Sequence, residues 1–160
     1  MHARRGFTLI ELVVVIMLLA VVTALAASAV SRGLPGQQLR RASREIAAEL
    51  RYTRARAIAT GRPQVFVFDT RTRAWRGPDR RHGQVPASVL VIATGARSEQ
   101  EGDGTAVVRF FPEGAATGGR FVLSAQRPGK ATGPTDGRGG WQVDVEWLTG
   151  EVRLSRAGGA

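Results

Sequence analysis

Residues 7–30 read FTLIELVVVIMLLAVVTALAASAV and follow a short basic leader, MHARRG, at residues 1–6. The run contains one charged side chain, Glu11. A helix rises about 1.5 Å per residue and the hydrocarbon core of a bilayer is about 30 Å thick, so this run is long enough to cross a membrane. The sequence therefore predicts a transmembrane helix over residues 7–30.

Glu11 is the residue of this run that indicates a functional role. A charged side chain at the bilayer centre costs about 2.5–3.5 kcal/mol on insertion scales, so a carboxylate there calls for a partner, unless it reaches up to the headgroups. A secretory signal peptide, whose cleavage site Ala24–Ala29 would imitate, has no use for this acid. Arg4 and Arg5 precede the run and favour a cytoplasmic N-terminus, with the rest of the chain outside the cytoplasm.

The nine residues RRGFTLIEL (4–12) resemble the class III leader of type IV pilins and type II secretion pseudopilins. The resemblance implies that a prepilin peptidase cuts between Gly6 and Phe7 and methylates the new N-terminus at Phe7. It also implies that Glu11 attracts the N-terminal amine of a neighbouring subunit during assembly. The physical argument agrees, because an amine at the same depth is the nearest cation for an acid in lipid.

Composition indicates one head domain beyond the span. The chain has 160 residues and a formal net charge of +10, so residues 31–160 have the size of one ordinary domain. The basic excess lies mostly before Pro63, where arginines near a membrane can meet anionic lipid headgroups, acidic partner subunits or nucleic acid. The chain has no cysteine, which excludes disulfides and thiol chemistry.

A second helix is predicted over residues 37–60. Gly33, Pro35 and Gly36 are expected to bend or interrupt the helix before it, as a hinge. The helix carries an apolar stripe, with its arginines mostly elsewhere and wet, and ends at Gly61 and Pro63. The stripe consists of Leu39, Ala42, Ser43, Ile46, Ala47, Leu50, Thr53, Ala57 and Ile58.

From residue 64 to residue 155 the apolar period changes from helical to alternating, which predicts strands. In the last part of this region, Trp141, Val143, Val145 and Trp147 would share one buried face. Thr149 and Gly150 predict a tight connection that makes the last strands a hairpin. The predicted strands are 64–69, 88–93, 106–111, 120–125, 141–148 and 151–155.

One helix followed only by short strands predicts an α+β head with the helix laid across antiparallel sheet. Within that class, FFPEGAATGGRFVL (110–123) and VDVEWLTGEVRL (143–154) resemble the H-type minor pseudopilin of type II secretion. The resemblance implies a pilin-like fold, in which a long N-terminal transmembrane and amphipathic helix precedes a sandwich-like antiparallel head.

Signals for other chemistry are weak. His2 would leave with the leader and His82 stands alone, so no catalytic role is expected and the chain is taken not to be an enzyme. The acidic segment 99–103 does not match a calcium loop, and neither a metal nor a cofactor is expected.

A second alternative is nucleic-acid binding. Trp75 lies among several arginines, and guanidinium groups with an aromatic ring can hold phosphates and stack on bases. The charges of the head nearly balance, however, so nucleic acid is not an expected partner. The arginines concerned are Arg71, Arg73, Arg76, Arg80, Arg81, Arg153 and Arg156.

The sequence therefore predicts a minor pseudopilin at or near the tip of a periplasmic pseudopilus that exports folded proteins across the outer membrane. It would be a single-pass inner-membrane protein with its head in the periplasm. The resemblance implies four partners: the other minor pseudopilins, the major pseudopilin, the inner-membrane assembly platform and the prepilin peptidase. The alternative is a minor pilin of a type IV pilus that acts in pilus assembly or DNA uptake.

Overall fold

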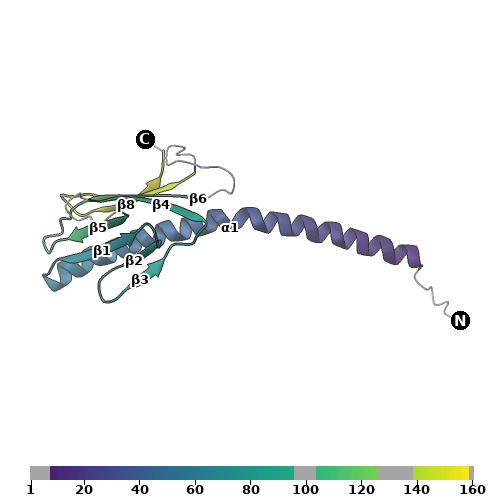
Figure 1. The fold of residues 1–160 in the computed structure, drawn as a ribbon, viewed down its shortest axis with the longest axis horizontal. Coiled ribbons are helices and arrows are strands. Elements are labelled where there is room, and N and C mark those ends of the chain that lie inside the picture. The colour runs from purple at the N-terminus through teal and green to yellow at the C-terminus, as the bar shows by residue number, and fades with distance from the viewer. Residues whose placement is uncertain (1–7, 96–103, 126–138, 159–160) are drawn as a thin grey trace. The chain divides into compact units, whose positions relative to one another are not determined.

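The structure is a computed structural model that describes residues 8–95, 104–125 and 139–158 (Figure 1). The chain divides into two compact units, Met1–Leu34 and Pro35–Ala160. Within the described residues, one helix is followed by eight strands. This order, with antiparallel pairing throughout, confirms the predicted α+β class.

Helix α1 begins at a residue that can cap it. It spans Leu9–Thr60, and the carbonyl of Thr8 accepts the N–H groups of Glu11 and Leu12 at 3.1 and 3.2 Å. The hydroxyl oxygen of Thr8 also accepts the Glu11 N–H at 3.4 Å. The sequence T-L-I-E thus supplies a cap residue with an acid three positions later, which is a typical start of a helix.

Residues 31–36 are helical, so the predicted interruption of the helix at this point is wrong. Pro35 lacks only one backbone donor, and the turns before and after it keep their own hydrogen bonds, which is sufficient in a helix of 52 residues. At the other end, Gly61 adopts a φ of 61° directly after Thr60, and the predicted stop is confirmed. No helix within the described residues is long and apolar enough to span a membrane.

The strands of the second unit form two antiparallel sheets of four strands each. The first has the order β3-β2-β1-β5 and the second the order β4-β6-β7-β8. The first sheet contains β1 (Gln64–Asp69), β2 (Ala74–Arg76), β3 (His82–Gln84) and β5 (Thr105–Phe110). The second contains β4 (Val89–Gly95), β6 (Gly119–Ala125), β7 (Trp141–Val145) and β8 (Val152–Arg156).

Aromatic rings join the two sheets in one core. The ring of Phe121 on β6 lies edge-on to Phe66 and Phe68 on β1, with centroids 5.8 and 6.0 Å apart. All three side chains are fully buried. Edge-to-face pairs add about 0.5–1.5 kcal/mol to the area that such rings bury, so this trio is a strong link between the sheets.

The second half of α1 supplies the third wall of the core, beside the strands in Figure 1. Eight of the nine predicted stripe residues are buried, and Ile58 is the exception at 47% exposure. The buried hydroxyls of Ser43 and Thr53 donate to the carbonyls of Leu39 and Glu49 at 2.8 Å. The predicted stripe is therefore the packing face, and its two polar members are satisfied by the helix itself.

The stripe prediction missed Glu49, which is only 3% exposed. Its carboxylate accepts hydrogen bonds from Nε and Nη2 of Arg81 at 2.8–3.0 Å. The Arg81 guanidinium also lies 4.5 Å from the ring centre of Tyr52, whose hydroxyl donates to Asp79 at 2.7 Å. A carboxylate on the core side of the helix is tolerated because an arginine from the β2–β3 connection reaches it. This pairing fixes that connection to α1.

Candidate functional site

The predicted assembly residues fall on or before the start of α1. Gly6 and Phe7, the expected cleavage and methylation positions, lie outside the described residues. Glu11 lies in the first turn of α1, and its side chain is exposed. The cleavage, the methylation and the charge pairing of Glu11 therefore stay predictions.

Of His2, His82 and the acidic segment 99–103, only His82 lies within the described residues. His82 is exposed on β3, where its Nδ1 lies 3.0 Å from the carbonyl oxygen of Arg80. Glu99, Glu101 and Asp103 lie outside the described residues. Among the residues that the structure does describe, no three histidine or carboxylate side chains are close enough together to hold a metal ion.

The arginine and tryptophan cluster that suggested nucleic-acid binding does not offer an exposed aromatic ring. Trp75 is 5% exposed and stacks on Phe66 at a centroid distance of 6.1 Å, so the idea that it could stack on a base is wrong. Arg81 is held by Glu49, and Arg153 is held by Glu151. The ring of Trp75 is therefore part of the core, and two of the arginines form ion pairs with carboxylates of the same chain.

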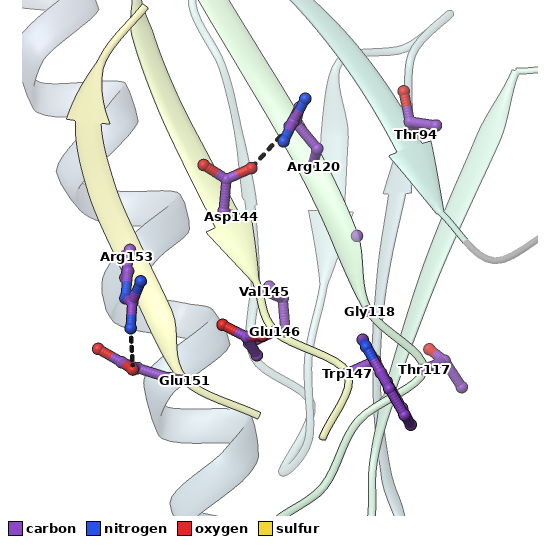
Figure 2. A pocket seen from close by; sticks show the side chains of 11 residues that line it. Thr94, Thr117, Gly118, Arg120, Asp144, Val145, Glu146, Trp147, Glu151 and Arg153 are labelled. Atoms are coloured by element: carbon purple, nitrogen blue, oxygen red, sulfur yellow. Dashed lines mark hydrogen bonds and ion pairs between the residues drawn. The ribbon is translucent and has the colours of Figure 1, made fainter. Parts of the chain in front are cut away.

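A surface pocket of about 700 Å³ lies on the outer face of the second sheet (Figure 2). Its floor is a row of side chains from four neighbouring strands. Thr94 pairs in register with Arg120, Arg120 with Asp144, and Asp144 with Arg153. Residues directly opposite one another in a sheet point to the same side, so the row forms one polar strip across the sheet.

The wall of the pocket comes from the turn between β7 and β8 and from the segment before β6. Trp147 lies at this edge beside Thr117 and Gly118, with Glu146 on its other side (Figure 2). Its side chain is 67% exposed. The prediction that Trp147 shares the buried face of Val143 and Val145 is therefore wrong, because β7 ends at Val145 and the turn reorients the residues that follow.

Hydrogen bonds hold the backbone of that turn, although the indole of Trp147 is exposed. Glu146 donates its N–H to the carbonyl of Glu151 at 3.0 Å and accepts the N–H of Gly150 at 2.9 Å. The carbonyl of Trp147 accepts the N–H of Ala116 at 2.9 Å. These bonds tie the β7–β8 turn to the segment that connects the two sheets, so the position of the Trp147 backbone is set by the head.

Arg54 of α1 bridges the β7–β8 turn and the segment that connects the two sheets. Its guanidinium donates to the carbonyl of Thr149 at 2.9 and 3.2 Å and to the carbonyl of Gly114 at 3.2 Å. Gly150 is buried with a φ of 61°, and a Cβ there would collide with the Gly114 carbonyl oxygen. Only glycine fits such a position without strain, because the backbone conformation is left-handed and the Gly114 carbonyl occupies the space that a Cβ would need.

Two ion pairs neutralise most of the charge in the pocket. Arg120 Nε lies 2.6 Å from Asp144, and Arg153 Nη2 lies 2.8 Å from Glu151 (Figure 2). The hydrogen bond from Arg153 is the main cause that lowers the pKa of Glu151, and the same contact raises the pKa of Arg153. Both groups therefore stay ionised near neutral pH. The arrangement offers an aromatic ring and ordered charges, which suits binding.

The sequence indicates the two segments that meet here, but it does not indicate the pocket that they form. Residues 110–123 and 143–154 carried the resemblance to H-type pseudopilins, and Gly114, Gly118 and Gly150 come from them. The alternating pattern of β7 extends in sequence to Trp147, which hid the end of the strand. Thr149 and Gly150 were the one signal that could have placed Trp147 in a turn.

Comparison with known proteins identifies the relatives of this chain. A family model described as type II transport protein GspH matches residues 42–150, and one described as a prokaryotic N-terminal methylation motif matches residues 1–27. Type II secretion system protein H of Xanthomonas campestris pv. campestris is 46% identical over 149 residues, which are 93% of this chain and 82% of that protein.

Solved structures show the same fold at low identity. The minor pseudopilin EpsH from the type II secretion system of Vibrio cholerae aligns with a TM-score of 0.57 and 15% identity, covering 78% of this chain and 97% of that one. The type IV minor pilin FimU of Pseudomonas aeruginosa aligns with a TM-score of 0.53 and 17% identity, covering 76% and 96%.

A long N-terminal helix packed on antiparallel sheets, with these structural relatives, places the chain in the pilin-like class. The predicted pilin-like fold is confirmed. Within that class, the chain belongs to the GspH family of type II transport proteins, the minor pseudopilins of type II secretion. The family is structural and is not a known family of enzymes, and its methylation motif indicates a membrane-anchored periplasmic protein.

We expect Arg54→Ala to lower the free energy of unfolding of the full chain by about 1–3 kcal/mol, because it leaves carbonyls of Gly114 and Thr149 without their donor. Thermal unfolding in detergent measures the change. The matched control is Arg44→Ala, which removes an exposed arginine of the same helix. Equal melting temperatures for the two variants would contradict the role of Arg54.

Proposed function

We propose that the chain is incorporated at or near the tip of a periplasmic pseudopilus and takes part there in the export of folded proteins. The observation that carries the proposal is the 46% identity to type II secretion system protein H over 93% of this chain. The fold adds support, since the head consists of two sheets that share one core and is suited to contacts between subunits. Its work is mechanical, without turnover of its own.

The proposal assigns each segment a task. Residues 1–6 are a leader removed by the prepilin peptidase, residues 7–30 are the membrane span, and residues 31–160 are the periplasmic head. Phe7 becomes the methylated N-terminus. The proposed partners are the other minor pseudopilins, the major pseudopilin and the assembly platform of the inner membrane. Support for the leader comes from RRGFTLIEL (4–12) and from the methylation motif over residues 1–27.

Deletion of the gene tests the function in the organism that encodes it. We expect a normally secreted enzyme to accumulate in the periplasm and a plasmid copy to restore its export. The measurement is the fraction of enzyme activity retained in the periplasm. Unimpaired secretion would contradict the proposal and favour a minor pilin of a type IV pilus. If that pilus takes up DNA, the head should bind DNA in a salt-sensitive way, and replacing Arg153 and Arg156 should abolish the binding.

Processing is tested on the protein isolated from membranes. We expect mass spectrometry of its N-terminal peptide to show a chain that begins at Phe7 and carries one methyl group on its amine. Replacing Gly6 with a bulky residue should leave the leader attached, so this variant is the unprocessed control for the wild type. A mature N-terminus between Ser28 and Ser31 would instead establish a secretory signal peptide.

Glu11→Ala tests the proposed pairing with the amine of a neighbouring subunit. We expect the variant to insert and keep its head folded but to be depleted from the pseudopilus, because the neighbouring amine loses its counter-charge in lipid. Cross-linking of subunits in the membrane measures incorporation, and thermal unfolding measures the head. Glu45→Ala, which removes an exposed glutamate of the head, is the control. Normal incorporation of the Glu11 variant would refute the pairing.

A further inference from the structure

Trp147 is the least expected surface residue of the head. A large aromatic side chain that is 67% exposed lies at the edge of an open pocket of about 700 Å³. Tryptophan is among the residues that dominate binding energies at protein interfaces, above all where it fits a pocket. The exposure of this ring therefore points to contact with another molecule.

The ring is also held ready for contact. Six hydrogen bonds hold its turn and the segment beside it: three between backbone groups around Glu146, Trp147 and Gly150, and three that Arg54 donates to Thr149 and Gly114. Gly118 lies against the side chain of Trp147: a Cβ placed on Gly118 would be 3.4 Å from the Cβ of Trp147. Because the backbone of this turn is already ordered, binding through Trp147 does not require a loop to be ordered first, which favours an anchor.

The charges of the pocket indicate what it binds. Asp144, Glu146 and Glu151 give three negative charges against the two positive charges of Arg120 and Arg153, so the pocket is net −1 in a chain whose net charge is +10. Both arginines are engaged by carboxylates. Glu146 is exposed and takes part in none of the ion pairs found among the described residues; it acts on Arg153 only at longer range, as the smallest of the causes, after Glu151, that raise the pKa of Arg153. The remaining charge beside the ring is therefore negative.

We propose that the Trp147 pocket docks a lysine or arginine side chain of a neighbouring pseudopilin, with the cation over the indole and beside Glu146. A cation over a tryptophan face is stabilised by the ring quadrupole, and a nearby carboxylate adds a charge-assisted hydrogen bond. The proposal rests on the proposed function, because that function supplies the neighbouring subunit. It gives the head a contact of its own, separate from Glu11.

The test uses the full-length chain produced in bacterial membranes together with each of the other pseudopilins of its secretion system. After extraction in mild detergent, the chain is captured by an affinity tag and the bound pseudopilin is measured. We expect Trp147→Ala and Glu146→Lys each to reduce capture by about tenfold or more. Leu148→Ala is the matched control, since Leu148 is 64% exposed on the same turn but does not line the pocket.

A charge swap identifies the docked group. We expect replacement of the docking lysine or arginine of the captured partner by glutamate to abolish binding to the wild type and to restore binding to Glu146→Lys. Thermal unfolding should be unchanged in both pocket variants, because these side chains are exposed. Wild-type capture by Trp147→Ala and Glu146→Lys, or an equal loss with Leu148→Ala, would overturn the pocket as the docking site.

Other outcomes separate this proposal from the proposed function. If the wild type captures no pseudopilin while gene deletion still traps the secreted enzyme, the docking proposal fails and the secretion function stands. If deletion leaves secretion intact, the proposed function fails. Capture of an untagged copy of this same chain, lost in Trp147→Ala, would make the occupant a second copy and overturn the proposal of a different neighbouring subunit.

Discussion

Burial of one narrow stripe of α1 is the constraint on which the rest of the head depends. Ile46 and Leu50 are fully buried in a core that also contains Phe66 of the first sheet and Phe121 of the second. The stripe is covered by side chains of both sheets, so the helix and the sheets share a single core. Loss of this contact would expose all of these apolar surfaces at once, since each wall buries the other two.

The flanks of the same helix add polar contacts to both sheets. Arg51 donates to the carbonyl of Val152 on β8 at 3.0 Å, and Arg54 donates to the β7–β8 turn. On the side of the first sheet, Glu49 binds Arg81 of the β2–β3 connection. These arginines were expected to be merely wet. The guanidinium groups of Arg51 and Arg54 instead donate to backbone carbonyls of β8 and of the β7–β8 turn, so they help to orient the second sheet on the helix.

The division of contacts along the chain suits a component of a filament. Glu11 belongs to the first unit, where the proposed partner is an amine, and Trp147 belongs to the second, where the proposed partner is a cationic side chain. Both sites carry a negative charge in a chain whose overall charge is +10. Such local reversals favour particular neighbours over general attraction, because a basic protein is otherwise repelled by basic partners.

The sequence by itself determined that a helical region precedes a region of strands, and it determined the stripe on α1, the stop at Gly61 and β1 to the residue, because helical and alternating periods are local properties of the chain. It also determined the family, through RRGFTLIEL (4–12) and the two head segments. It missed β2 and β3, which have three residues each and too little pattern to detect.

Only the tertiary structure decided the division of the strands into two sheets, the burial of Glu49 and the exposure of Trp147. Glu49 looks like any surface acid until Arg81, 32 positions away, is placed beside it. Trp147 continues the alternation of β7 in sequence, yet Gly150, Gly114 and Arg54 form a turn that directs it to solvent. Contacts between distant segments set both positions, and no local pattern contains that information.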